Sequence, residues 1–233
     1  MKHIELQTAF ELEIAQLDNN LTKPTTSDIE YWLMAGLDKF IKTRYSGINF
    51  KAKGFEQDQK RIDDLRTLVT RKAYQFTTYP EEYVVTLPDD YMLTVGETAV
   101  IFSYSHCWPV GPSGQPRTKN TDVLEATVEN IDRQMENSLS EYRLHGTSAK
   151  PLRLYQGNEI HLYTDGNYHL RNYILTYLRT PKKISLTDAP FEEYTDMPVS
   201  THLEIVKLAA ELYLENEANP RYQSYMNEVS TME

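Results

Sequence analysis

The sequence predicts an α+β protein, because the hydrophobic period changes twice along the chain. Apolar residues recur every three or four positions in the first third, as in helices with one buried face. Alternating runs rich in Val, Ile and Tyr fill the middle, which is typical of strands. A strongly apolar helical run follows near residue 200. We therefore expect N-terminal helices, a central antiparallel β-sheet and a C-terminal helix.

Residues 1–70 are predicted to be helical. A first helix is expected from Ile4 to Leu17, and a second helix begins near Ser27, because Ser27 and Glu30 have capping-box spacing. Gly47 ends the second helix, and a third runs from about Glu56 to Thr70. The expected buried residues are Leu6, Phe10, Ile14, Leu17 and Leu21 in the first helix, Ile29, Trp32, Leu33, Leu37, Phe40 and Ile41 in the second, and Ile62, Leu65, Leu68 and Val69 in the third.

Residues 73–181 are predicted to be mostly β. One strand runs from Tyr83 to Leu87, a more apolar one lies within "VGETAVIFSYS", and Gly157-Asn158 marks a hairpin. The turn "TDGN" leads into a last strand, "YHLRNYILTYLRTP", that ends at Pro181. Between them, 106–122 is predicted to be a surface loop and 127–143 is moderately helical. We expect one meandering antiparallel sheet.

The C-terminal helix, "HLEIVKLAAELYLE", is unusual because nine of the twelve residues from Leu203 to Leu214 are apolar. Ser200 or Thr201 is expected to cap it. Its polar residues form one narrow row, consisting of Glu204, Lys207, Glu211 and Glu215. Its apolar residues form two stripes, consisting of Ile205, Leu208, Ala209 and Leu212 and of Val206, Ala210, Tyr213 and Leu214.

Two interpretations of this helix follow. It is a central core helix, or its second stripe, Val206, Ala210, Tyr213 and Leu214, contacts a neighbouring subunit. The mean hydropathy of −0.58 favours the subunit interface, because such a chain has few apolar residues left to surround a helix.

Residues 218–233 are predicted to be a docking tail after a single domain at 1–217. Its apolar residues, Tyr222, Tyr225, Met226 and Val229, have helical spacing. A helix this short is marginal alone in water, so we expect it to be mobile in a free subunit and to order on a partner.

Composition limits the possible functions. The net charge of −10 argues against tight nucleic-acid binding, which needs surplus cations. One cysteine, Cys107, fits a reducing compartment, and no apolar run approaches the ~20 residues of a membrane span. Three glutamates in the first 13 residues argue against a signal peptide. We expect a soluble cytosolic protein without a membrane partner, and the 17 tyrosines favour assembly interfaces.

No group of residues predicts an active site, a cofactor site or a metal site. A thiol enzyme would pair Cys107 with a distant histidine such as His145 or His202. A metal site would use His161 and His169, which flank the "TDGN" turn, but two histidines without a third ligand are usually ordinary sheet residues. We expect no enzymatic activity. A small cytosolic thiol- or metal-dependent enzyme is the alternative from another class.

The order of several short motifs resembles a family. These are "KPTTSDIEYWLMAGLDKFIKTRYSG", "FEQDQKRIDDLRTLV", the turn "LPDDY", the strand end "YLRTP" and "MPVSTHLEIVKLAAELYLE". Together they resemble the head-to-tail adaptor proteins of short-tailed bacteriophages, and most of all a ring protein of crAss-like gut phages. The resemblance covers about Lys23 to Glu217, but the loop from His106 to Asp122 has no counterpart in it.

The resemblance implies a dodecameric connector ring in the phage neck. Such a ring joins the portal to the tail, lines the channel through which genomic DNA passes without specific binding, and needs no cofactor. The C-terminal segment would reach the portal protein, and other tail rings would be further partners. The expected location is the virion, and the host cytoplasm during assembly. A lower tail ring or stopper and a monomeric accessory factor are alternatives.

Overall fold

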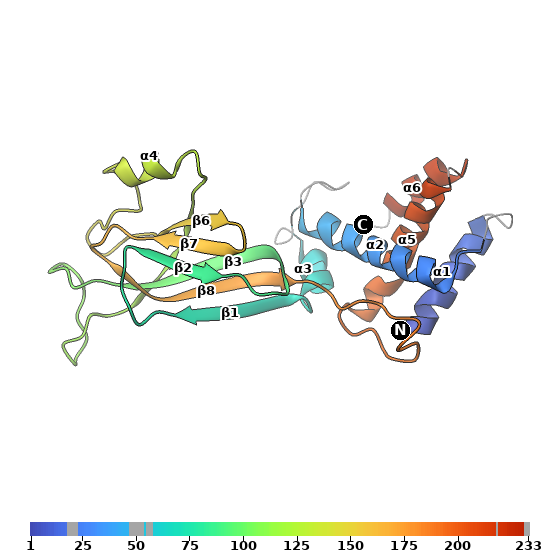
Figure 1. Cartoon of the computed structure of the whole chain (residues 1–233), viewed down its shortest axis with the longest axis horizontal. Coiled ribbons are helices and arrows are strands. Elements are labelled where there is room, and N and C mark those ends of the chain that lie inside the picture. The colour runs from blue at the N-terminus through green and yellow to red at the C-terminus, as the bar shows by residue number, and fades with distance from the viewer. Residues whose placement is uncertain (18–22, 47–53, 55–57, 218, 231–233) are drawn as a thin grey trace. The chain divides into compact units, whose positions relative to one another are not determined.

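The β-strands form an insertion between helices that belong together, as a computed structural model of the chain shows (Figure 1). It describes residues 1–17, 23–46, 54, 58–217 and 219–230 and confirms the α+β class. The helical unit comprises residues 1–68 and 181–233, and the β unit comprises residues 69–180. One domain over 1–217 was expected. The difference arises because the first and last strands of the insertion pair with each other, with Val69 opposite Leu178, so the chain enters and leaves the β unit at one place.

The helical unit contains five α-helices among the described residues. They are α1 (His3–Leu17), α2 (Thr26–Tyr45), α3 (Gln59–Leu65), α5 (His202–Asn216), which follows a 3-10 turn (Val199–Thr201), and α6 (Tyr222–Ser230). The predicted buried faces of α1 and α2 are largely confirmed, although Trp32 is only half-buried. Leu21 and Gly47 lie outside the described residues. None of the described helices has the length and apolar character needed to cross a membrane.

The capping box of α2 uses residues two positions earlier than predicted. The Thr25 hydroxyl accepts from the N–H of Asp28, and the Asp28 carboxylate accepts from the N–H of Thr25 at 2.9 Å. Glu30 instead accepts from the N–H of Leu186 at 2.5 Å. At α5, Thr201 occupies the capping position, but its hydroxyl donates to the carbonyl of Pro198.

The third helix is shorter than predicted, because α3 ends at Leu65 and a strand begins at Val69. The residues from Val69 to Gln75 each have a partner on the last strand of the β unit. This ladder satisfies the backbone groups that face that strand, and the β-branched Val69 and Thr70 suit a strand. The prediction of helix up to Thr70 was therefore wrong.

The β unit has two four-stranded sheets instead of the predicted single meander. One sheet has the order β1 (Val69–Gln75), β8 (His169–Arg179), β3 (Tyr91–Phe102) and β4 (Lys119–Asp122). The other has the order β2 (Glu82–Thr86), β7 (Glu159–Tyr163), β6 (Leu152–Gln156) and β5 (Leu124–Glu125). Only β5 and β6 pair in parallel among the described strands. The "TDGN" turn crosses from one sheet to the other, which sequence alternation cannot show.

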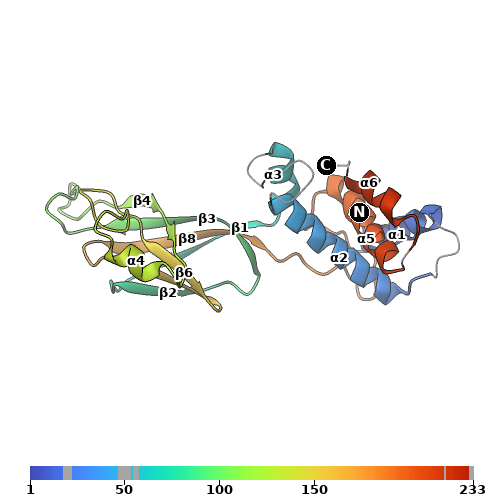
Figure 2. The same cartoon turned by 90° about the horizontal axis from the view of Figure 1, so that it is seen from above.

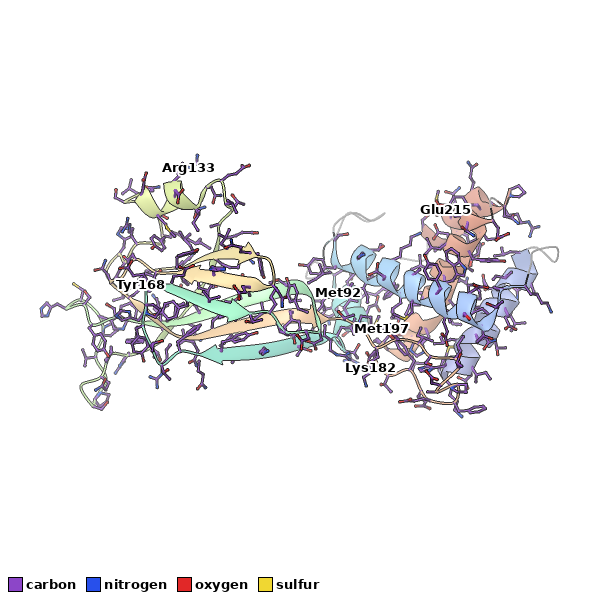
Figure 3. All side chains as sticks on the ribbon, viewed as in Figure 1. Met92, Arg133, Tyr168, Lys182, Met197 and Glu215 are labelled. Carbon is purple, nitrogen blue, oxygen red and sulfur yellow. The ribbon has the colours of Figure 1, made fainter. Side chains whose placement is uncertain are left out.

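The space between the two sheets holds the core of the β unit. Inward residues alternate along β2 and β8, and Tyr168, labelled in Figure 3, is among the fully buried side chains. The predicted hairpin at Gly157-Asn158 is confirmed, because Gln156 pairs with Glu159. The predicted loop 106–122 ends in β4, and the predicted helix 127–143 is reduced to α4 (Ile131–Glu136).

Candidate interaction surfaces

The four residues predicted to contact a neighbouring subunit lie in the core of the helical unit. Val206, Ala210, Tyr213 and Leu214 are each no more than 4% exposed. α5 lies between α1, α2 and α6 (Figures 1 and 2), so the chain's own helices cover both of its apolar stripes. The subunit-interface prediction for these residues was wrong, and the central-core interpretation is correct.

Two contacts show how tightly α5 is enclosed. The Tyr213 ring meets the rings of Phe10 and Trp32 nearly edge-on, with centroids 6.1 and 5.9 Å away. At Gly36, α2 comes so close to α5 that a Cβ atom there would lie 2.7 Å from the backbone nitrogen of Ala209. A glycine in the middle of α2 thus permits backbone approach between the two helices.

The polar row of α5 faces α2 and α3 as well as solvent. Glu211 is buried and forms an ion pair with Lys39, with 2.9 Å between the Lys39 Nζ and the Glu211 Oε2. Glu204 accepts from Arg44 at 2.5 Å and from Lys60 at 3.2 Å. These two carboxylates therefore link α5 to cations from distant parts of the sequence.

Arg44 is the centre of this network. Its Nε donates to Asp64 at 3.0 Å, its guanidinium lies over the Phe40 ring, and both ionic side chains are buried. Burial raises the pKa of the Asp64 carboxyl, and the nearby Arg44 charge opposes this shift. The network has the character of a structural ion-pair cluster.

A pocket of about 160 Å³ opens beside the network. Its apolar lining comes from Phe40, Leu208, Met226 and Val229, and its charged lining from Lys39, Arg44, Glu204 and Glu211. The volume suits one apolar side chain better than a cofactor, since ligand pockets usually measure about 300 Å³ or more.

The predicted docking tail is folded against its own unit as α6. Tyr225 and Val229 are buried, and the Tyr225 hydroxyl donates to Glu13 of α1 at 2.9 Å. Tyr222 is half-buried and Met226 is exposed. The prediction of four residues free to dock was wrong, because α1 and α5 cover two of them. Tyr222 and Met226 remain accessible.

The candidate residues for thiol chemistry lie in separate places. Cys107 is exposed in the loop after β3, and His145 pairs with Ser148 in a different loop. His202 belongs to the helical unit, where its Nε2 lies 3.1 Å from the carbonyl of Met197. Within the described residues, no hydrogen bond or ion pair joins Cys107 to a histidine.

His161 and His169 do not face each other, since β7 and β8 belong to different sheets. His161 Nδ1 lies 2.8 Å from Glu82, with Glu159 3.7 Å from its Nε2. The described ranges contain no cluster of three or more residues able to hold a metal ion.

The loop between β3 and β4 is held in shape by its own contacts. Trp108 is buried and its Nε1 donates to the carbonyl of Arg117 at 2.6 Å. Val110 pairs with Pro116 in an isolated bridge. The loop nevertheless exposes Tyr104 and Val110, so it presents apolar side chains on an ordered backbone. The Pro/Gly composition predicted a surface loop but gave no sign of this order.

An aromatic cluster lies beside this loop. Phe102 packs against Tyr79 and Tyr104, with ring centroids 5.0 and 5.6 Å away, and His169 contacts all three rings. Burial lowers the pKa of His169. Next to the cluster is a concavity of about 550 Å³ that also includes Arg171. Sequence reasoning missed this cluster because its members come from three separate segments.

In comparisons with known proteins, no family model and no curated protein matches this chain.

Proposed function

We propose that the chain is a structural subunit of a phage neck ring that joins the portal to the tail and lines the DNA channel. The ordered motifs from Lys23 to Glu217 support this proposal through their resemblance to adaptor proteins. A subunit in a stack of rings contacts its neighbours within the ring and the rings on either side. It therefore needs several separate contact surfaces, whereas a small-molecule enzyme needs one concave site.

The observation that carries the proposal is the exposure of large apolar side chains at several separate places. In the β unit, the ordered loop after β3 exposes Tyr104 and Val110, and Val128 and Leu139 are exposed on either side of α4. In the helical unit, Val199 and Leu203 are exposed one helical turn apart. Where such side chains lie next to each other, as Val199 and Leu203 do, they are candidates for protein contacts.

Because α6 packs against its own unit, only its accessible residues are proposed to contact the portal. Met226 and Tyr222, with the adjacent pocket, form the part of the predicted tail that can meet the portal. The net charge of −10 suits a wall past which DNA slides. A gel-shift assay should show only weak binding, and submicromolar affinity that is lost steeply with salt would contradict this role.

Native mass spectrometry and negative-stain electron microscopy of the purified chain, alone and mixed with portal, test the proposal. We expect a closed ring, dodecameric in the virion, that binds the portal. A chain that stays monomeric in both samples would count against it and favour an accessory factor. A ring that binds tail rings and not the portal would identify the alternative, a lower tail ring or stopper.

The effect of two exposed residues can be separated from folding. Replacing Val199 and Leu203 by Ser should weaken ring formation while the circular dichroism spectrum stays unchanged. Cys107→Ser is the control. Cys107 is also exposed, but its side chain is small, so replacing it removes little apolar surface. This control should form rings normally, whereas a thiol enzyme would lose its activity with this change.

A further inference from the structure

The β unit has two open strand edges on opposite sides of one sheet. The sheet order β1-β8-β3-β4 places β1 at one edge and β4 at the other. Among the described residues, β1 pairs only with β8 and β4 only with β3. An open edge presents unpaired backbone groups to which another strand can add.

The free side of β1 carries backbone groups directed away from β8. The N–H of Phe76 donates to Arg171 at 2.9 Å, which makes this a hydrogen-bonded pair. Because such pairs alternate along an antiparallel ladder, the N–H and C=O groups of Arg71, Ala73 and Gln75 point to the open side. A groove of about 730 Å³, lined by Lys72–Phe76 and Val84–Asp89, runs along this side.

The two edges have the correct polarity to meet in a ring. Each neighbouring pair in this sheet is antiparallel, so β1 and β4 run in opposite directions. When copies are related by rotation about an axis along the strands, every copy keeps its strand directions. The β1 edge of one copy then meets the β4 edge of the next as an antiparallel pair. Two different edges that meet head to tail generate a closed ring when the rotation between successive copies closes, and an open filament when it does not.

The side chains select one register. Arg71 and Ala73 lie on the outer face of the sheet. Their partners on β8 are Thr176 and Ile174, which alternate with residues buried in the core, namely Tyr173, Leu175 and Tyr177. Asn120 and Asp122 lie on the outer face of β4 by the same criterion, since Ala99 and Ile101 are buried. When β1 of one copy pairs with β4 of the next, the outer residues of both strands must lie opposite each other. A register that does this places Arg71 opposite Asp122 and Ala73 opposite Asn120.

We propose that β1 of one copy pairs with β4 of the next copy in this register, so that the sheets of neighbouring subunits join edge to edge. This inference rests on the proposed ring function and names its subunit contact. Arg71 and Asp122 are both exposed in the single chain. Cross-strand pairs of opposite charge stabilise a sheet, whereas like charges directly opposite destabilise it.

The charges on the edges also explain why one pairing is selected. Charged side chains on an exposed edge normally block pairing with unrelated strands. Two β1 edges would bring Arg71 and Lys72 of both copies together, which is unfavourable. The β4 edge supplies Asp122 instead. The same residues thus prevent dimers through β1 and permit the head-to-tail contact.

Charge reversal tests the proposed pair. Arg71→Glu alone and Asp122→Arg alone should each abolish the ring in native mass spectra and leave a folded monomer. The double variant Arg71→Glu/Asp122→Arg should recover the ring. Lys119→Glu, which changes a charge on the inner face of the same edge, is the control. Rings that persist in both single variants would overturn the inference.

Cysteine cross-linking tests the register directly. In a Cys107→Ser background, Ala73→Cys with Asn120→Cys should give a ladder of covalent multimers on oxidation, because directly opposite Cβ atoms lie about 4.5–5.5 Å apart. Lys72→Cys with Asn120→Cys places the thiols on opposite faces and should give no ladder. Wild-type rings without a ladder would overturn the edge pairing alone. A wild type without rings would overturn the proposed function and the inference together.

Discussion

The helical unit and the β unit bury their charges in different ways. In the helical unit, the two carboxylates Glu211 and Glu204 on α5 pair with Lys39 and Lys60, whose side chains are 36% and 45% exposed, whereas Arg44 and Asp64 form a buried ion pair. The two apolar stripes of α5 are covered by α1, α2 and α6, although Leu203 at the start of the helix is exposed. Water therefore shares the solvation of the two lysines.

In the β unit, the charges lie between the two sheets. Glu97 on β3 pairs with Arg153 on β6 at 3.0 Å and accepts from the Tyr173 hydroxyl. The Tyr155 hydroxyl lies 3.4 Å from Glu97, and burial, with Glu97 as a further cause, raises the pKa of both tyrosines. Arg153 also reaches Glu125 at 3.0 Å.

The difference lies in what the buried charges connect. The β unit network connects one sheet to the other, and both Glu97 and Arg153 are largely buried. Loss of one partner there leaves a charge that water cannot easily solvate. In the helical unit, the most important constraint is instead the close contact between two helix backbones.

The largest expected effect is that of Glu97→Ala. It leaves Arg153 with Glu125 as its remaining ion-pair partner and with the Tyr155 ring, and it removes the acceptor of two tyrosine hydroxyls. Removing one partner of a buried pair costs about 3–5 kcal/mol, and we expect the lower end because Glu125 remains. Urea denaturation followed by near-ultraviolet circular dichroism measures the free energy of unfolding.

Glu125→Ala is the matched control for Glu97→Ala. The Glu125 side chain is 75% exposed, so its ion pair with Arg153 should contribute less than about 1 kcal/mol. If both variants lower the free energy of unfolding equally, the burial of Glu97 does not make its ion pair with Arg153 stronger than that of the exposed Glu125.

The next effect concerns backbone contact in the helical unit. Gly36→Ala would place a Cβ atom 2.7 Å from the Ala209 nitrogen, so α2 and α5 must separate. Overpacking of this kind costs about 1–3 kcal/mol. Gly96→Ala in β3 is the comparison, since a Cβ atom there meets nothing within 4 Å. Thermal unfolding should show a lower Tm for Gly36→Ala only; a lower Tm for both would remove the contrast between the units.

Much of the fold could be predicted from the sequence where local and global preferences agree. The spacing of Leu6, Phe10 and Ile14 gave α1, and the turn at Gly157-Asn158 gave the hairpin between β6 and β7. The edge strand β1 was missed because Arg71 and Lys72 make it hydrophilic, and its identity depends on pairing with the distant β8.

The candidate interface on α5 could not be predicted from composition. The mean hydropathy averages over all residues and carries no information on where they lie, so it could not show that α1, α2 and α6 enclose α5. The tail was misjudged for a similar reason. Its order depends on Tyr225 meeting Glu13, and a contact between residues so far apart in sequence leaves no local signal.

A smaller effect is expected for Tyr225→Phe. The variant keeps the buried ring but loses the hydrogen bond to Glu13, which contributes about 0.5–1.5 kcal/mol. Hydrogen exchange should increase in α6 and leave the rest of the helical unit unchanged. Tyr222→Phe is the control, since Tyr222 is only half-buried and its hydroxyl interacts with the exposed Glu215. Unchanged exchange in Tyr225→Phe would show that burial alone holds α6.

The smallest effect is a pH dependence that separates the two units. Burial lowers the pKa of His202 in the helical unit from its usual value of 6.5, and the positive N-terminus lowers it further. Its Nε2 lies 3.1 Å from the Met197 carbonyl, and its Nδ1 lies 3.1 Å from the amino group of Met1, which suits a neutral ring.

The sign of the dependence follows from proton binding. The unfolded chain binds the proton of His202 more readily than the folded chain, so the contribution to stability is complete above about pH 6.5 and is lost as the pH falls through the folded pKa. Hydrogen exchange should show faster opening of α5 as the pH is lowered, after correction for the intrinsic exchange rate. His202→Gln should remove this slope and leave that of His169 in the β unit, where burial also lowers the pKa. If His202→Gln keeps the full slope in α5, another group controls the acid sensitivity of the helical unit.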